Sequence, residues 1–240
     1  MPYPKRKFHY ILRLISFTLL IAFFIKLRKS NILPHDEFIH EIMTKRVDIT
    51  NKMNLNLSSW INLSPSNFCH TTNSNLLFTA LVIIAPNSFH KRQLIRATWA
   101  NQTLFSSKLR VIFVVGMSPY LEVNKQIQTE FNMHQDILQL KLLDSYFRIT
   151  KKLMIGFKWV HTYCSNSKYV LRINEDVFVN TFALIRLFTN DIVYKRRQIY
   201  GWLNRNFTTY VDRRENEKFF VSRKDYACDQ YPDYPSGKSF

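Results

Sequence analysis

Two adjacent carboxylates, Glu175 and Asp176, are the side chains of this sequence most suited to chemistry. They end an apolar run that starts at Tyr169, in a chain with no acidic residue between positions 49 and 121. Adjacent charges in such a run are costly unless they are paired or bind a cation. A hard divalent ion takes oxygen ligands from one or two carboxylates plus substrate phosphates. The pair is therefore either a Mg²⁺ or Mn²⁺ site, or a strand end whose acids bond to backbone amides or to Arg172.

Basic and polar candidates are less specific. Arg92 and Arg96 lie four residues apart in a predicted helix, where they either clamp a phosphate or form a solvated face. Asp144 follows a predicted strand and either hydrogen-bonds to a ligand or caps the next helix. No His or Cys has metal-ligand spacing, so the sequence does not indicate zinc. With only 4 glycines, the chain has no glycine-rich loop of the Walker or dinucleotide-binding type.

Strands and helices alternate along the part of the chain that would position these residues. Continuous apolar runs predict strands, and apolar residues at helical spacing predict the helices between them. The predicted strands cover residues 76–84, 109–116, 136–143 and 169–179, and the predicted helices cover residues 89–99, 121–133 and 149–163. This order predicts an α/β fold with a mainly parallel, Rossmann-like sheet, flanking helices, and a site at the carboxyl ends of the strands.

The first 75 residues have a different organisation. Residues 8–27 are apolar with basic flanks, which predicts one transmembrane signal-anchor after a cytosolic tail of residues 1–7; a secretory signal peptide is disfavoured because no small-residue cleavage site follows. Residues 28–75 are rich in Asn, Ser and Thr without sustained periodicity and are predicted to be a lumenal stem. Glycosylation sequons that permit a lumenal location occur at Asn56, Asn62, Asn101 and Asn206.

The charge balance of the 240 residues is strongly basic. Lys and Arg number 34 against 17 Asp and Glu, a formal net charge of +17. Such an excess favours anionic surroundings or partners, such as nucleotide phosphates, acidic glycans or lipid head groups. We expect no nucleic-acid partner, because the sequence contains no recognition motif.

From residue 76 onward, ordered blocks of the chain resemble the β-1,3-galactosyltransferase and β-1,3-N-acetylglucosaminyltransferase family (glycosyltransferase family 31). Residues 92–99 are similar to its R-x-x-I-R-x-T-W motif, and residues 169–180 to the strand that carries D-D-D-V-F-V-N. Further blocks are Val111 to Gly116, Asp136-Ile137-Leu138, Asp144-Ser145-Tyr146, Tyr200-Gly201, Phe220-Val221-Ser222 and Tyr231 to Gly237.

This resemblance implies a type II Golgi membrane enzyme with a GT-A fold. Such an enzyme uses UDP-galactose or UDP-N-acetylglucosamine and Mn²⁺ to form a β-1,3 linkage, with inversion, on a glycoprotein or glycolipid glycan. By alignment, Asp176 is the expected metal ligand, assisted by Glu175. The positions expected near the nucleotide are Arg92, Arg96, Asp144, Lys152 and Asn174.

The chain also departs from the family pattern. Its triplet is Asn174-Glu175-Asp176, and Pro235 replaces a Cys, which removes a disulfide partner; Cys69 and Cys164 could bridge in an oxidising lumen. The family's E-D-V-x-x-G segment, with the expected catalytic base, would lie beyond Phe240. The alternative function is therefore a catalytically inactive, truncated relative that binds UDP-sugar, glycan or a partner transferase.

Overall fold

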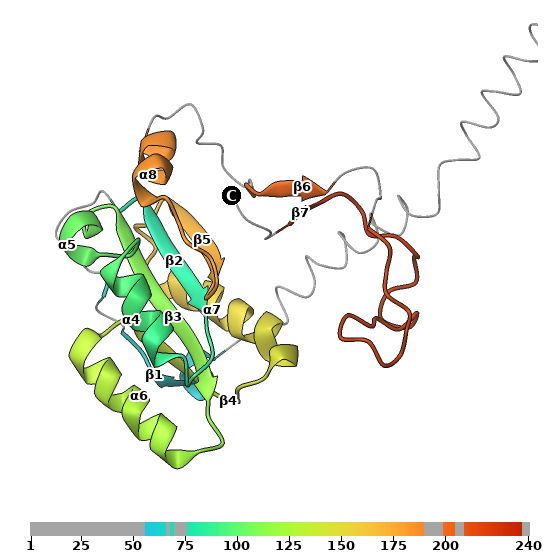
Figure 1. The fold of residues 1–240 in the computed structure, drawn as a ribbon, viewed down its shortest axis with the longest axis horizontal. Helices are drawn as coiled ribbons and strands as arrows, with labels where there is room; N and C mark the ends of the chain where they lie inside the picture. The colour runs from blue at the N-terminus through green and yellow to red at the C-terminus, as the bar shows by residue number, and fades with distance from the viewer. Residues whose placement is uncertain (1–55, 66–67, 70–75, 190–198, 205–208, 237–240) are drawn as a thin grey trace, which may run out of the picture. The chain divides into compact units, whose positions relative to one another are not determined.

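The computed structural model describes residues 56–65, 68–69, 76–189, 199–204 and 209–236. The elements, as labelled in Figure 1, are α3 (Leu57–Trp60), β1 (Ile61–Leu63), β2 (Phe78–Ile83), α4 (Phe89–Ala97), α5 (Gln102–Phe105), β3 (Leu109–Met117), α6 (Leu121–His134), β4 (Ile137–Leu143), η1 (Tyr146–Arg148), α7 (Ile149–Tyr163), β5 (Tyr169–Asn174), α8 (Thr181–Thr189), β6 (Trp202–Asn204) and β7 (Tyr234–Ser236). All of them lie in one of two compact units. The described part of the other is Ser222–Cys228, a turn in which the Ser222 hydroxyl donates to Asp225 Oδ2 at 2.6 Å.

Five strands form one sheet in the order β1-β4-β3-β2-β5. The four strands β2 to β5 are parallel, and β1 pairs antiparallel with β4 at one edge. The prediction of a mainly parallel α/β sheet is confirmed. The strand order changes direction at β2, because β3 and β4 are added on one side of it and β5 on the other.

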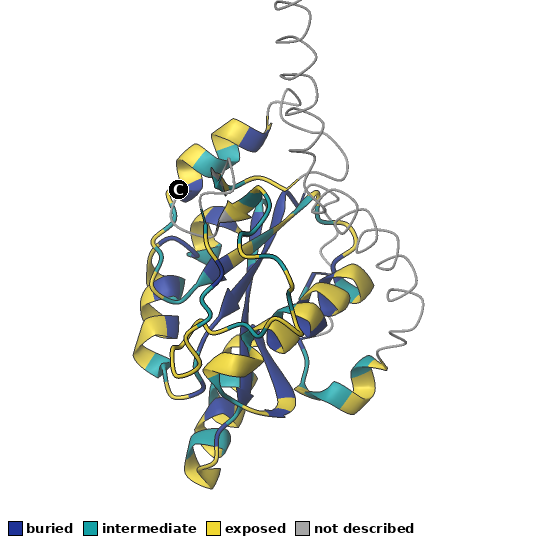
Figure 2. Ribbon diagram, turned by 90° about the vertical axis from the view of Figure 1, so that its right-hand side faces the viewer, coloured by how far each residue is buried: buried dark blue, intermediate teal, exposed yellow. Residues whose placement is uncertain are grey.

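Helices cover both faces of the sheet, which explains why β2 is buried along its whole length and reads as an unbroken apolar run. On one face, Phe78, Ala80 and Val82 of β2 pack in a core that includes residues of α4, α5, α6 and α8. On the other face, Leu81 and Ile83 pack against α7 and α3. Figure 2 shows the buried strands between helices whose outer surfaces are exposed.

The last predicted strand is shorter than expected. The apolar pattern predicts a strand over residues 169–179, but β5 ends at Asn174 and a turn follows at Glu175 and Asp176. Val177 and Val179 are apolar because they pack against the core shared with α4 and α8, not because they extend the strand. The carboxylate pair therefore lies beyond the strand, in the turn.

Residues expected to form an aperiodic stem contribute to the folded unit. Within residues 28–75, the short helix α3 packs toward α7, and β1 adds an antiparallel edge strand with Ile61 opposite Leu140. Both elements are only a few residues long, too short for a periodic pattern to reveal them. Cys69 forms a disulfide with Cys164, 95 positions later, at the end of α7.

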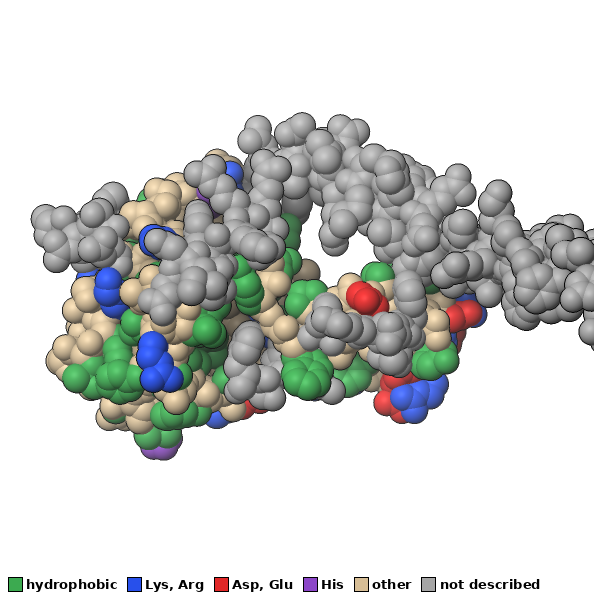
Figure 3. All heavy atoms as spheres, turned by 90° about the horizontal axis from the view of Figure 1, so that it is seen from above, with side chains coloured by type: hydrophobic (Ala, Val, Ile, Leu, Met, Phe, Trp, Pro, Cys, Tyr) green, Lys and Arg blue, Asp and Glu red, His purple; other side chains and the backbone are tan. Residues whose placement is uncertain are grey.

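On the face in Figure 3, the visible Lys and Arg side chains are scattered among hydrophobic and neutral groups, and some lie beside Asp and Glu side chains. No helix among the described residues is long and apolar enough to span a membrane. The predicted anchor, residues 8–27, and most of the predicted stem lie outside the described ranges.

The disulfide generates a prediction about stability. Replacing both Cys69 and Cys164 by Ser should lower the free energy of unfolding by about 2–5 kcal/mol, because the cross-link no longer restricts the unfolded chain. Urea denaturation with and without a thiol reductant measures this. Reductant should bring the wild type to the midpoint of the double variant, and a wild-type midpoint that ignores reductant would contradict the disulfide.

Candidate functional site

The candidate site lies at the carboxyl ends of β2 and β5, where the sheet changes its winding direction. From β2 the chain crosses by way of α4 on one face, whereas β5 is reached by way of α7 on the other face. Because the strand order reverses between these two adjacent strands, their carboxyl ends form the kind of switch point at which open α/β sheets bind ligands. Asn174, the last residue of β5, lies opposite Ile83 of β2, so Glu175 and Asp176 stand at this junction.

Glu175 is held by both of its carboxylate oxygens. Lys91 of α4 donates from Nζ to Oε1 at 2.7 Å, and the backbone amide of Ala85 donates to Oε2 at 3.2 Å. Burial raises the pKa of Glu175, but Lys91, the Ala85 amide and Ser88 outweigh it and keep this pKa below its ordinary value. The hydrogen bond and charge of Glu175 in turn raise the pKa of Lys91. Of the alternatives for Glu175, a bond to a backbone amide is thus observed. The cationic partner of Glu175 is Lys91, not Arg172.

Asp176 has a different environment from its neighbour. Its side chain is exposed, and no described residue donates a hydrogen bond to it or pairs with it. An accessible carboxylate of this kind can give oxygen ligands to a divalent ion that also binds substrate phosphates. No cluster of three or more His, Cys, Asp and Glu exists among the described residues. The donor set at the junction is therefore Asp176, with Glu175 beside it.

Asp144 and Lys152 form a buried ion pair at the same edge of the sheet. Lys152 Nζ donates to Asp144 Oδ2 at 2.7 Å and to the carbonyl of Ile84 at 2.9 Å. The Gly116 amide also donates to Asp144 Oδ2, at 2.8 Å. Asp144 thus does not cap the following helix η1, whose N-cap residue is Ser145, and that oxygen is not free for a ligand.

The approach of Asp144 to β3 requires a glycine at position 116. A Cβ added there would lie 2.8 Å from the carbonyl oxygen of Leu142 and 2.9 Å from Asp144 Oδ2, closer than van der Waals contact permits. A glycine inside an apolar strand often marks a close approach of this kind. Gly116, one of only 4 glycines in the chain, is therefore a signal from which this contact could have been predicted, although sequence reasoning did not use it.

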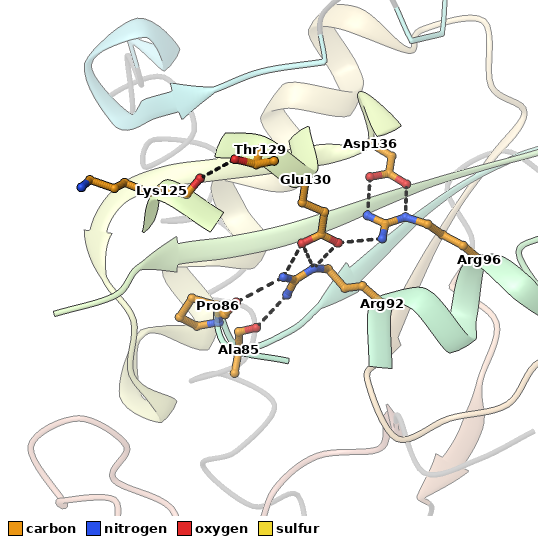
Figure 4. Close-up of polar contacts among 8 residues, drawn as sticks. All are labelled: Ala85, Pro86, Arg92, Arg96, Lys125, Thr129, Glu130 and Asp136. Atoms are coloured by element: carbon orange, nitrogen blue, oxygen red, sulfur yellow. Dashed lines mark hydrogen bonds and ion pairs between the residues drawn. The ribbon is translucent and has the colours of Figure 1, made fainter. Parts of the chain in front are cut away.

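Arg92 is buried in an ion-pair network between α4 and α6 (Figure 4). Its guanidinium is bonded to both oxygens of Glu130, with Nη2 to Oε2 at 2.6 Å. It also donates to the carbonyls of Ala85 at 3.1 Å and Pro86 at 3.2 Å. Arg92 has 0% exposed surface, so it is not a solvated side chain. Its guanidinium donors are bound to protein oxygens and are therefore not free to clamp a phosphate.

Arg96 extends this network by one helical turn. It forms two hydrogen bonds to Asp136, at 2.7 and 2.8 Å, and donates to Glu130 Oε1 at 2.6 Å. Burial lowers the pKa of Arg96, but the bonds to the two acids outweigh that effect and raise it. The i, i+4 spacing correctly placed both arginines on one helix face, but it gave no sign of the acids from α6 and the start of β4 that neutralise them.

Three charged side chains of the site converge on the backbone just after β2. Lys152 binds the carbonyl of Ile84, Arg92 binds the carbonyls of Ala85 and Pro86, and Glu175 binds the amide of Ala85. Sequence reasoning missed Lys91, Ala85 and Glu130, since their roles depend on contacts across 34 to 90 positions.

Three of the four sequons lie in the described residues. Asn56 and Asn101 cap the starts of α3 and α5 through Oδ1. Asn62 in β1 instead donates from its amide to Gln139 at 2.8 Å. Asn206 lies outside the described ranges.

Comparison with known proteins decides the family. The family model for galactosyltransferases matches residues 90–240. The chain belongs to this galactosyltransferase family. It is 33% identical over 168 residues to mouse beta-1,3-galactosyltransferase 2 and 30% identical over 180 residues to beta-1,3-galactosyltransferase 5 of Pan paniscus. It is also 26% identical over 177 residues to lactosylceramide 1,3-N-acetyl-beta-D-glucosaminyltransferase A of Danio rerio.

These alignments cover most of this galactosyltransferase-family chain but only part of each relative. The shares of this chain are 68%, 73% and 70%, and the shares of the relatives are 39%, 57% and 46%, in the same order. The chain therefore spans about half the length of the curated relatives it matches.

The Arg92–Glu130–Arg96 network generates a pH prediction. Burial raises the pKa of Glu130, but Arg92 and Arg96 outweigh it and lower this pKa from its ordinary 4.5. Because the folded-state pKa is depressed, the ionised carboxylate stabilises the fold above pH 4.5, and this contribution is lost as pH falls through the folded-state value. Urea denaturation between pH 7 and pH 3 should show this loss, and Glu130→Gln should reduce the slope of stability against pH.

At pH 7, Glu130→Gln should cost about 3–5 kcal/mol because it leaves buried Arg92 without its charge partner. Glu122→Gln, an exposed substitution on the same helix, should keep the wild-type slope. If the Glu130 variant does not fold, NMR titration of the wild-type carboxyl group replaces it. A midpoint at or above 4.5 would contradict the prediction.

Proposed function

We propose that this protein is a Golgi hexosyltransferase that transfers galactose or N-acetylglucosamine from a UDP-sugar to a glycan hydroxyl. The linkage formed would be β-1,3, with inversion at the anomeric carbon, on a glycoprotein or glycolipid acceptor. The observation that carries this proposal is an exposed aspartate, Asp176, at the winding junction of a parallel sheet in a galactosyltransferase-family chain. The names of the similar proteins, which include galactosyl- and N-acetylglucosaminyltransferases, support both donor sugars. The sheet and its two helical layers support a GT-A-type fold.

The donor set suits a divalent cation of the Mn²⁺ type. Asp176 would hold it, since its carboxylate is exposed and no described residue binds it. Hard divalent ions are commonly bound by one or two carboxylates together with substrate phosphates. When bound, such an ion supplies charge neutralisation to the diphosphate leaving group.

The chain's own residues would shape the donor side of this reaction. In the reaction, the acceptor oxygen forms a bond to the anomeric carbon, the bond from that carbon to the UDP oxygen breaks, and the hydroxyl proton passes to a base. We propose that Asn174 and Asp176 face the donor. Lys152 and Asp144 would fix the ends of β2, β3 and β4 beneath it, while Arg92 and Arg96 hold α4 against α6. Positioning of this kind lowers the barrier by fixing the reacting groups before attack.

We also propose a type II topology, with the sheet domain in the Golgi lumen. The basic-flanked apolar segment 8–27 supports an anchor of this type. The disulfide between Cys69 and Cys164 supports an oxidising compartment, since such bonds are rare in the cytosol.

The proposed donor site predicts a loss of metal-dependent nucleotide binding in Asp176→Asn. Calorimetry of the full chain with UDP and Mn²⁺ should show binding about 100-fold weaker than wild type, because a metal-binding carboxylate is replaced by a neutral amide of the same shape (about 2.7 kcal/mol). Glu122→Gln, an exposed acid on α6, should bind as wild type does. Equal affinity of Asp176→Asn and wild type would overturn the assignment of Asp176.

Turnover is measured separately, with UDP-galactose and UDP-N-acetylglucosamine and a glycan acceptor. Sugar transfer supports the enzyme. Mn²⁺-dependent UDP binding without any transfer by the full chain would instead support a relative that only binds the donor.

The proposed topology predicts N-glycans on the sheet domain. Peptide-N-glycosidase treatment of the full chain from mammalian cells should increase its gel mobility. Thr103→Ala should remove one glycan while preserving the helix cap, because the position 103 amide still donates to Asn101 Oδ1. Unchanged mobility of the wild type after treatment would contradict a lumenal domain.

A further inference from the structure

Glu175 has the surroundings of a structural anchor rather than those of a metal ligand. One oxygen accepts a hydrogen bond from Lys91 at 2.7 Å, and the other accepts one from the Ala85 amide at 3.2 Å. Only 25% of its side-chain surface is exposed. A cation bound to Glu175 would also lie close to the Lys91 ammonium, which would repel it.

The amide that Glu175 binds belongs to a segment after β2 whose carbonyls are also bonded. The carbonyls of Ala85 and Pro86 are held by Arg92, which is itself buried against Glu130. Glu175 therefore joins the end of β5 to a backbone segment that α4 and α6 already hold. Lys91, one residue before Arg92 on α4, is tied to the same segment through its helix.

The next residue along the chain, Asp176, has the opposite properties. It is exposed, and no described residue binds its carboxylate. The two acids share one turn, so the bonds of Glu175 determine where the backbone of that turn lies and hence where Asp176 is presented. Glu175 is therefore bound to protein groups, whereas Asp176 is accessible to a ligand.

We propose that Glu175 is a positioning residue for Asp176, acting through the Ala85 amide with Lys91 as its counter-charge, and not a second ligand of the ion. This inference rests on the proposed function, in which Asp176 binds the metal–nucleotide donor. The family alignment gave Glu175 only an assisting role beside Asp176, and the contacts of the folded chain indicate what that role is.

A charge-matched double variant tests the proposal. Lys91→Met with Glu175→Gln removes one positive and one negative charge, so the net charge stays the same, and the Gln oxygen still accepts from the Ala85 amide. As a positioning residue, Glu175 tolerates this change, and the Mn²⁺ concentration needed for UDP binding stays within about threefold of wild type. Glu175→Ala, which loses the amide acceptor, raises that concentration about tenfold, as supporting residues of metal sites typically do.

A metal-ligand role predicts a different pattern. A neutral Gln is a poor substitute for a carboxylate ligand, so the double variant and Glu175→Ala would then be impaired alike, and that result overturns the proposal. Lys125→Met with Glu122→Gln, the same exchange on exposed positions of α6, serves as the control and leaves Mn²⁺-dependent UDP binding unchanged.

Two further measurements distinguish a failure of the Glu175 proposal from unfolding of a variant and from a failure of the proposed function. The urea midpoint of each variant shows whether weakened binding reflects unfolding. If wild type shows no Mn²⁺-dependent UDP binding, the proposed function fails. If wild type binds and Asp176→Asn does not, the proposed function stands, and the comparison of the two Glu175 variants alone decides the role of Glu175.

Discussion

The structure depends on how the chain satisfies the backbone of Ile84, Ala85 and Pro86, where the central strand β2 ends. Backbone groups at the end of a buried parallel strand have no sheet partner and are costly if left unbonded. Here the partners are charged side chains from distant parts of the chain: Lys152 from α7, Arg92 from α4 and Glu175 from the turn after β5. One short segment thereby connects both helical layers and the two strand ends at which the sheet changes direction.

These side chains are buried or half-buried charges, so each requires its own counter-charge. Arg92 and Arg96 share Glu130 and Asp136, Lys152 pairs with Asp144, and Glu175 pairs with Lys91. These ion pairs use four of the 17 acidic residues in a chain that has 34 Lys and Arg. Asp176 stands apart from the pattern because no described residue forms a hydrogen bond or ion pair with its carboxylate, at the place where an α/β sheet binds its ligand.

Much of the fold could be predicted from periodicity. The alternation of apolar runs and helical spacing placed α4, α6 and α7 and the strands β2, β3 and β4 close to their observed bounds, because long buried elements have strong patterns. The pattern failed where it was short or ambiguous. β1 has three residues, and Val177 and Val179 are apolar for packing rather than for pairing, which extended the predicted strand past Asn174.

For the site, the sequence by itself determined that Glu175 and Asp176 follow a buried strand, that Arg92 and Arg96 share a helix face, and which family's motifs these residues resemble. Only the tertiary structure decided which charges meet: that Arg92 binds Glu130, that Asp144 approaches Gly116, and that Glu175 rather than Asp176 is bound by Lys91. The physical reason is the separation along the sequence of the residues that interact. Helix and strand periodicity is set by neighbours a few residues apart, whereas an ion pair is set by the folded path that brings together residues up to 84 positions apart.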